Sequence, residues 1–157
     1  MSEVFTIVTK NNSVAAVQDI LAAYAASTKI LKLIAVEMAA NGQTTVGNYA
    51  LRLRYFPTTV TAGSGGAAVT PANVNPGGAA SSFTARRNDT TQASTSGTAI
   101  DLVATQFNPI NGYYWQPPVQ PGDEPGAALS GAFILSLDGI SGTINVSATM
   151  WLKEIGG

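Results

Sequence analysis

Residues 143–155, TINVSATMWLKEI, decide the fold class. Apolar and polar residues alternate through this stretch with a period of two, which is the spacing of a strand with one face in a core and the other in water. The inner face is predicted to carry Ile144, Val146, Ala148, Met150 and Leu152. Trp151 falls on the opposite, polar face, where a large aromatic ring is a candidate for an interface.

Strand-like segments recur along the chain, separated by turns rich in Gly, Pro, Asn and Asp. They cover residues 4–9, 29–38, 49–56, 83–87, 98–107, 113–115 and 129–137. Together with the last strand they predict a single all-β domain over residues 1–157, an eight-stranded antiparallel jelly-roll sandwich. An immunoglobulin-like sandwich is the nearest alternative.

One segment, residues 13–26, has a pattern that favours a helix. Val14, Val17, Leu21 and Tyr24 recur near helical spacing, and the segment is rich in alanine. Ser13 can cap the start. In an alternative, the first strand continues through Val14 and the helix covers only about residues 17–24. Both versions predict one short helix near the N-terminus.

The composition excludes most catalytic chemistry. Charged residues make up 11% of the chain, against about 25% in an average domain, and there is no Cys and no His. Catalytic triads, thiol nucleophiles and thiolate or imidazole zinc sites are therefore excluded. The adjacent carboxylates Asp123 and Glu124 lie between two Pro-Gly turns, where a solvated turn is favoured over a tuned acid–base pair. We expect no enzyme activity, no cofactor, no metal and no small-molecule substrate.

Nucleic acid and membranes are also not expected as partners. The formal net charge is −1, without the clustered Lys and Arg that nucleic acid requires. The most apolar stretch, residues 30–40, contains Lys32 and Glu37 and is much shorter than the roughly 20 residues of a membrane helix. The start Met1-Ser2-Glu3 does not have the pattern of a secretory signal.

Two strand segments, residues 29–38 and 129–137, are apolar on both faces. One apolar set of the first segment is Ile30, Ile34, Val36 and Met38, and the other is Leu31, Leu33 and Ala35. A strand of this kind is covered on both sides. Together with the low charge, this predicts an oligomer in which neighbouring subunits cover the second faces.

Residues 61–82 are rich in Gly, Ala, Pro, Ser and Thr and are predicted to form a flexible loop or arm, with a brief edge strand at Val69-Thr70. Within them, residues 63–68 match the dinucleotide pattern GxGxxG/A. The residues that follow, Val69-Thr70-Pro71, cannot begin the helix that a pyrophosphate site needs. We therefore interpret this glycine-rich piece as a loop.

The candidate interface residues are two arginines and three aromatic residues. Arg86 and Arg87 either contact a carboxylate of a partner or are solvated at a strand end. The run Tyr113-Tyr114-Trp115 is expected to place part of its side chains in the core and to leave one exposed anchor, with Tyr114 and Trp115 as candidates. Trp151 completes the set.

Four stretches together carry a family resemblance. They are VAAVQDILAAYA at residues 14–25, GSGGAAVTPANVNPGG at 63–78, NDTTQAS at 88–94 and WLKEIGG at 151–157. They resemble a group of small proteins of tailed bacteriophages that look like jelly-roll capsid decoration, or cement, proteins. The resemblance spans most of the chain and includes no catalytic motif.

This resemblance implies a structural virion protein that is made in the host cytoplasm and lies as a homotrimer on the outer capsid surface, bound to the major capsid protein. It also implies that residues 14–17 are extended and that the helix is short. In this setting, residues 61–82 would order across capsid subunits. The alternative is a carbohydrate-binding or receptor-binding β-sandwich module of a phage fibre or tail, with Tyr113, Tyr114 and Trp115 as its binding surface. A third hypothesis, an enzyme that uses carboxylates alone, would depend on Asp123 and Glu124.

Overall fold

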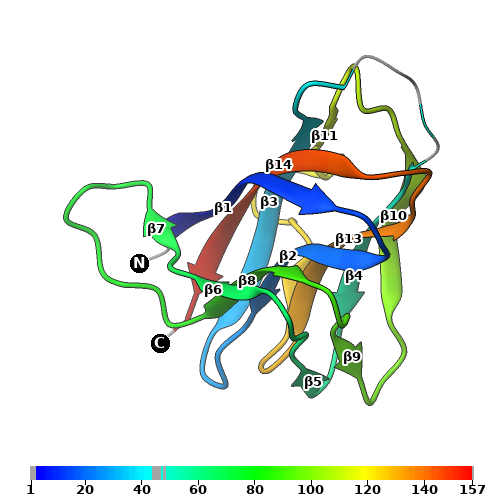
Figure 1. The fold of residues 1–157 in the computed structure, drawn as a ribbon. Coiled ribbons are helices and arrows are strands. Elements are labelled where there is room, and N and C mark those ends of the chain that lie inside the picture. The colour runs from blue at the N-terminus through cyan, green and yellow to red at the C-terminus, as the bar shows by residue number, and fades with distance from the viewer. Residues whose placement is uncertain (1–2, 44–46, 48, 157) are drawn as a thin grey trace.

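The structure is a computed structural model that describes residues 3–43, 47 and 49–156. These residues form 14 strands and no helix. Every strand pairing is antiparallel, and two six-stranded sheets, which we call sheet A and sheet B, face each other as a sandwich (Figure 1). The all-β antiparallel prediction is therefore confirmed. No part of the described chain is a helix long and apolar enough to cross a membrane.

Each sheet contains strands that are far apart in the sequence. In pairing order, sheet A runs β11 (Tyr113–Trp115), β3 (Ile30–Ala40), β14 (Ile144–Ile155), β1 (Glu3–Val14) and β7 (Ala72–Asn73), and β12 (Gly126–Ala127) also pairs with β3. Sheet B runs β10 (Ile100–Phe107), β4 (Tyr49–Phe56), β13 (Ala132–Gly139), β2 (Gln18–Tyr24), β8 (Thr84–Asp89) and β6 (Ala67–Val69). A separate pair joins β5 (Val60–Thr61) to β9 (Ser94–Thr95).

The alternation of the last strand is confirmed in β14. Its five predicted inner residues are at most 2% exposed, and they lie in the main hydrophobic core. Leu51, Leu53, Phe133 and Leu135 of sheet B belong to the same core. Because inward side chains of both sheets fill one layer, β14 fixes which face of sheet A is turned toward sheet B.

The predicted helix is wrong, because residues 18–24 form strand β2 in the centre of sheet B. This strand pairs with β13 on one side and β8 on the other, and residues 18–23 are buried on both faces. A strand buried on both faces does not show an alternating pattern, so its apolar residues can match a helical spacing by chance. Of the two alanines of β2, Ala23 lies in the main core, and Ala22 belongs to the outer cluster that also contains Ala93. Of residues 14–17, which were expected to be extended, only Val14 lies in a strand, at the end of β1, and Ala16 and Val17 form a bend before β2.

A β-bulge in β3 overturns the two-faced interpretation of residues 29–38. Leu33 pairs with Leu152 but Ala35 pairs with Trp151, so Ile34 is an extra residue. A bulge shifts the alternation by one position. Consequently the inner face takes residues from both expected sets, which are all 1% exposed or less: Leu31, Leu33, Val36 and Met38. Strand β3 therefore turns one face, rather than two, toward the core of this chain.

In β13, both faces are buried, but the same chain covers them. Phe133, Leu135 and Leu137 lie in the main core, whereas Ala132 and Ile134 belong to a second cluster on the outer side of sheet B. Ala93 is buried in that second cluster, and Val60 packs against it. These two residues come from β5 and the segment just before β9. The cover predicted from neighbouring subunits is thus provided within the chain.

The glycine-rich segment 61–82 runs from sheet B to sheet A. Its strand β6 pairs with β8 at the edge of sheet B, and its strand β7 pairs with β1 at the edge of sheet A. The approach is closest at Gly66, where a Cβ would lie 2.1 Å from the carbonyl oxygen of Arg87. Glu3 holds the far end of the segment through Asn73 Nδ2 and the amide of Ala79.

Candidate functional site

The aromatic run of β11 alternates between the two faces of sheet A. Tyr113 pairs with Met38 and Trp115 with Val36, and both partners are core residues. Tyr114 pairs with Glu37 on the outer face and is 61% exposed. Because directly opposed residues share a face, Trp115 is directed toward the core and Tyr114 is the exposed anchor of the run.

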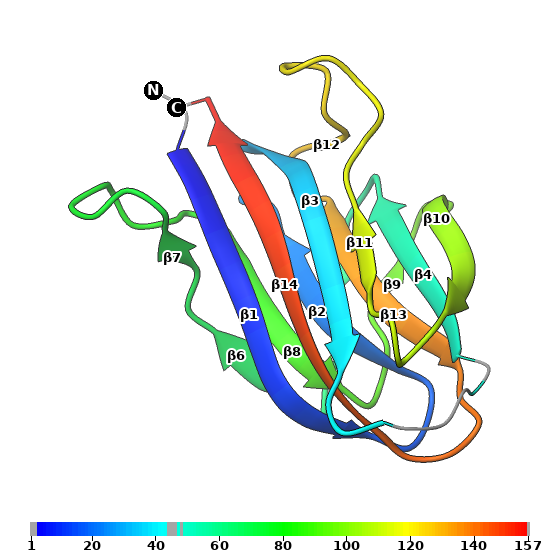
Figure 2. The same cartoon turned by 90° about the horizontal axis from the view of Figure 1, so that it is seen from above.

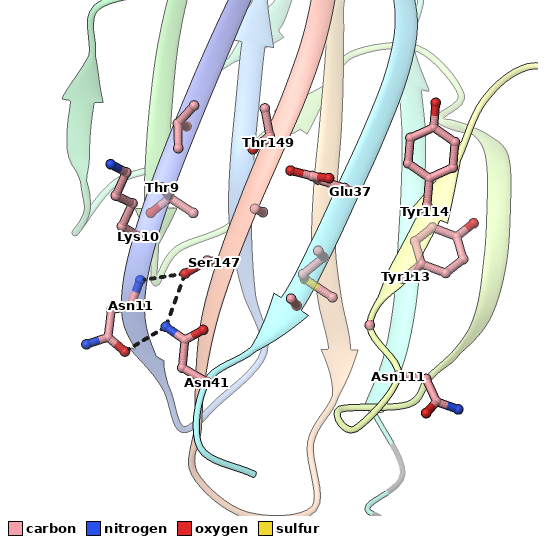
Figure 3. A pocket seen from close by; sticks show the side chains of 15 residues that line it. Thr9, Lys10, Asn11, Glu37, Asn41, Asn111, Tyr113, Tyr114, Ser147 and Thr149 are labelled. Atoms are coloured by element: carbon pink, nitrogen blue, oxygen red, sulfur yellow. Dashed lines mark hydrogen bonds between the residues drawn. The ribbon is translucent and has the colours of Figure 1, made fainter.

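Tyr114 forms one wall of a groove on the outer face of sheet A (Figure 3). The groove has a volume of about 690 Å³ and is open to solvent. It crosses β1, β14 and β3 and reaches β11, so it is assembled from strands far apart in the sequence. Amides, hydroxyls and single charges dominate its polar lining: Lys10, Asn11, Glu37, Asn41, Ser147 and Thr149.

Three polar residues at one end of the groove hold each other in place. The backbone N–H of Asn11 donates to Ser147 Oγ over 3.0 Å, and Asn41 Nδ2 donates to Asn11 Oδ1 at 3.0 Å and to Ser147 Oγ at 3.2 Å (Figure 3). Asn11 lies at a bulge of β1 and has a φ of 52°, a conformation that asparagine tolerates better than most residues. The bulge thereby directs the Asn11 amide N–H to Ser147.

The two charged residues of the groove have no ion pair among the residues that the structure describes. Glu37 is exposed and lies beside Thr149 and Tyr114 in one cross-strand row. Lys10 is exposed on β1, at the other side of the groove. A free carboxylate and a free ammonium are thus presented together with uncharged polar groups.

Four large apolar side chains are exposed toward one end of the sandwich. We call these four residues the apolar rim: they are Ile30, Val74, Val119 and Leu129, which are 43% to 52% exposed. Ile30 pairs with Ile155, and the amide of Val74 donates to the carbonyl oxygen of Val4. Figure 2 shows both chain ends and the loop between β11 and β12 at this end. The groove lies nearer the opposite end, where Ala39 pairs with Ser147.

The two adjacent arginines predicted as interface residues have different surroundings in the structure. Arg86 binds Asp89 of its own chain through two hydrogen bonds, Nε to Oδ2 at 2.8 Å and Nη2 to Oδ1 at 2.7 Å. These bonds raise the pKa of Arg86. Arg87 is half-buried beside Leu21 and forms no ion pair within the described ranges. Arg86 thus has its carboxylate partner within the chain, whereas an interface role of Arg87 stays a prediction.

Trp151 is half-buried on the outer face of sheet A, between Thr6 and Ala35. Its place on the face away from the core agrees with the alternation of β14. It does not line the groove. Its role in an interface also stays a prediction.

The outer face of sheet B carries a buried network of charges that the sequence patterns did not reveal. Asp19, 1% exposed, accepts hydrogen bonds from the Ala93 amide at 2.7 Å and from Gln92 Nε2 at 3.3 Å, and lies 3.6 Å from Arg54 Nη2. Burial raises the pKa of Asp19 to about 6, although these partners oppose the shift. The network fastens residues 92–93 to sheet B.

Asp138 continues this network. It accepts hydrogen bonds from Arg52 Nη1 at 2.9 Å, Gln92 Nε2 at 3.0 Å and Ser136 Oγ at 2.8 Å. Burial acts to raise the pKa of Asp138, but these hydrogen bonds outweigh it and the pKa is lowered. Gln92 therefore joins Asp138 to Asp19.

The weaker sequence motifs have structural explanations. Residues 63–68 lead into β6, so a strand follows the glycines where a dinucleotide site needs a helix. Glu124 accepts a hydrogen bond from the Gly122 amide and pairs with Lys32, and these contacts lower its pKa. In the described part of the chain, no three Asp or Glu residues gather into a possible metal site.

Comparisons of the chain with protein-family models, with curated proteins and with solved structures give no match. The resemblance to phage decoration proteins therefore stays a prediction, and the functional argument depends on the groove and the apolar rim.

Proposed function

We propose that the protein is a structural component of a bacteriophage virion, which decorates the outer surface of the capsid as a trimer and stabilises it by binding major capsid subunits. The resemblance of four sequence stretches to phage decoration proteins motivates the proposal. The apolar rim is the structural observation that carries it.

The proposal includes a jelly-roll fold. Eight principal strands can be arranged as β1-β14-β3-β11 in one sheet and β2-β13-β4-β10 in the other, with the remaining strands as additions at the edges. Successive strands from β1 to β4 alternate between the two sheets, as expected for two interlocking Greek keys. This order supports a jelly roll over an immunoglobulin-like sandwich.

The apolar rim supports docking to another protein. Its four large apolar side chains lie on loops and strand ends, where they contribute little to the core of this chain. Protein interfaces take their binding energy from such side chains once water is excluded around them. A capsid repeats the same contact many times, so a modest affinity at each site is sufficient for stable decoration.

The trimer depends on the resemblance alone. The two-faced strands give it no support, since β3 has a single apolar face and the second face of β13 is covered by Ala93 and Val60. Sedimentation of the purified protein tests this part directly. A trimer is expected, and a stable monomer would contradict it.

Binding to purified, expanded heads of the phage that encodes the chain tests the capsid contact. We expect the wild-type protein to co-sediment with heads, and the double variant Ile30→Ser, Leu129→Ser to bind at least about ten-fold more weakly, a loss of about 1.4 kcal/mol. The matched control is Val17→Ser, Ile110→Ser, which removes two exposed apolar side chains at the opposite end. Equal binding by both double variants would exclude the rim, and a wild-type protein that ignores heads would contradict the function.

A further inference from the structure

We propose that the groove on the outer face of sheet A binds a neutral oligosaccharide, which lies across β1, β14 and β3 with one sugar ring against Tyr114. This activity goes beyond capsid decoration, and it uses a surface separate from the apolar rim.

Tyr114 provides the stacking surface. Its side chain is 61% exposed at the edge of the sheet, and its hydroxyl donates a hydrogen bond over 3.3 Å to Oε1 of Gln116, the residue after β11. That bond uses the polar end of the residue and leaves the ring available. An exposed aromatic ring with few rotatable bonds is suited to contact with the apolar C–H face of a sugar.

The hydrogen-bond capacity at the other end of the groove suits hydroxyl groups. Ser147 Oγ accepts two hydrogen bonds, from Asn11 and Asn41, so its own proton is free to donate. Asn41 uses its amide nitrogen in both of its bonds, and its carbonyl oxygen remains an acceptor. A donor and an acceptor held side by side match the hydroxyl of a sugar, which both donates and accepts.

The charges favour a neutral ligand. Glu37 can accept two hydrogen bonds from neighbouring hydroxyls of a sugar, and Lys10 can donate. Neither has an ion pair in the described part of the chain, so neither must be released before a ligand binds. One charge of each sign attracts no anion selectively. A phosphate, sulfate or acidic sugar would require the arginine or lysine cluster that this lining lacks.

The same lining argues against a protein partner at this place. The centres of protein interfaces are apolar and depleted in charge, a description that fits the apolar rim better than the groove. The groove volume of about 690 Å³ is within the range of small-ligand sites. Since the groove lies nearer the end opposite the rim, a decorated capsid could expose it to solvent.

The test is a screen of the purified protein on an array of neutral and acidic glycans, followed by calorimetric titration of the best neutral oligosaccharide. We expect binding that falls at least ten-fold in Tyr114→Ala and about five-fold in Glu37→Gln. The variant Tyr114→Phe keeps the ring and is expected to bind within about three-fold of wild type. Ile100→Ala removes an exposed apolar side chain outside both the groove and the apolar rim, and it is expected to leave glycan binding unchanged. Thermal unfolding of each variant verifies that it is folded.

Several results would overturn the proposal. They are the absence of binding to every neutral glycan at millimolar concentration, a preference for acidic glycans, and neutral-glycan binding that survives both Tyr114→Ala and Glu37→Gln. Loss of head binding in Tyr114→Ala, without any glycan binding by wild type, would assign the groove to a protein contact. The glycan assay requires no phage heads, so it can fail or succeed independently of the capsid function.

Discussion

The outer faces of the two sheets differ in how they are covered and in how they use charge. On sheet B, residues 92–93 lie over the strands, and Asp19, Arg54 and Asp138 are part of one bonded network. On sheet A, the groove is open, and Glu37 and Lys10 have no ion pair among the described residues. One face therefore completes the fold, and the other is available for a partner.

The ion pairs on sheet B give a second explanation for the low content of charged residues, besides the coverage by neighbouring subunits that the sequence predicts. Several of the few charged residues bind each other on the outer face of sheet B: Asp19, Arg52, Arg54, Arg86, Asp89, Asp101 and Asp138. Among them Asp19 and Asp89 are buried and Arg54 and Asp138 are half-buried, whereas Asp101 remains exposed. A low charge content therefore does not by itself indicate surface buried between subunits.

The largest expected effect on stability comes from shortening a buried side chain on the outer face of sheet B. Ile134 is fully buried in the second cluster, and Ile134→Ala is expected to lower the free energy of unfolding by about 2–5 kcal/mol, because it leaves a cavity under the cover. Thr149→Ala, on the open face, is expected to change it by less than about 0.5 kcal/mol. Urea unfolding measures both. Similar values for the two variants would mean that the cover on sheet B does not persist in solution.

A smaller effect is the change in folding stability with pH that the titration of Asp19 is expected to cause. Its folded pKa of about 6 exceeds its usual value of 3.8, so the folded state holds the proton more tightly. The stability contributed by this group is full below about pH 4 and is lost as the pH rises through 6, by about 3 kcal/mol.

Because Asp138 and Glu124 have lowered pKa values and act in the opposite direction, the quantity to measure is the difference between wild type and Asp19→Asn. We expect the unfolding free energy of the wild type, minus that of Asp19→Asn, to fall as the pH rises from about 3.5 to 7. Parallel curves for the two proteins would show that Asp19 does not titrate in a buried site.

The smallest expected effect is the difference in unfolding free energy between alanine variants of two adjacent arginines. Arg86→Ala leaves the 1%-exposed Asp89 without its ion pair and is expected to cost about 2 kcal/mol, less than a fully buried pair because Arg86 is 28% exposed. Arg87→Ala removes no ion pair and is expected to cost less than about 1 kcal/mol. Urea unfolding at pH 7 distinguishes them, and a larger loss for Arg87 would contradict the assignment.

The strands that could be predicted from the sequence are those with one buried face and one solvent-exposed face. In β14, the alternation of Ile144 to Leu152 identified the inner face correctly, because solvent imposes the polar half of the pattern. In β2, both faces are buried, so no position had to be polar and the sequence did not alternate. The alanines then favoured a helix. The bulge at Ile34 has no sequence signal that distinguishes it from ordinary alternation.

The candidate site was predictable only in part. The run of three aromatic residues indicated one exposed anchor, and register identifies it as Tyr114 rather than Trp115. The rest of the groove could not be predicted, because its residues come from separate strands whose register is set by tertiary pairing. The pair Asn11-Asn12 was a weak signal, since asparagine favours the backbone found at the β1 bulge. A lone Asp19 among apolar residues was a signal for the buried network.

The bulge in β3 makes the two halves of that strand interdependent. Leu31 and Leu33 are out of phase with Val36 and Met38, and Ile34 alone restores their common face. Because side chains alternate at every position, deletion of Ile34 would remove the bulge and leave these four residues on one face by simple alternation. Deletion of Lys32 would instead place Leu31 and Leu33 on opposite faces, so a loss at a regular position of this strand acts like a core substitution, whereas a loss of the half-buried Ile34 does not.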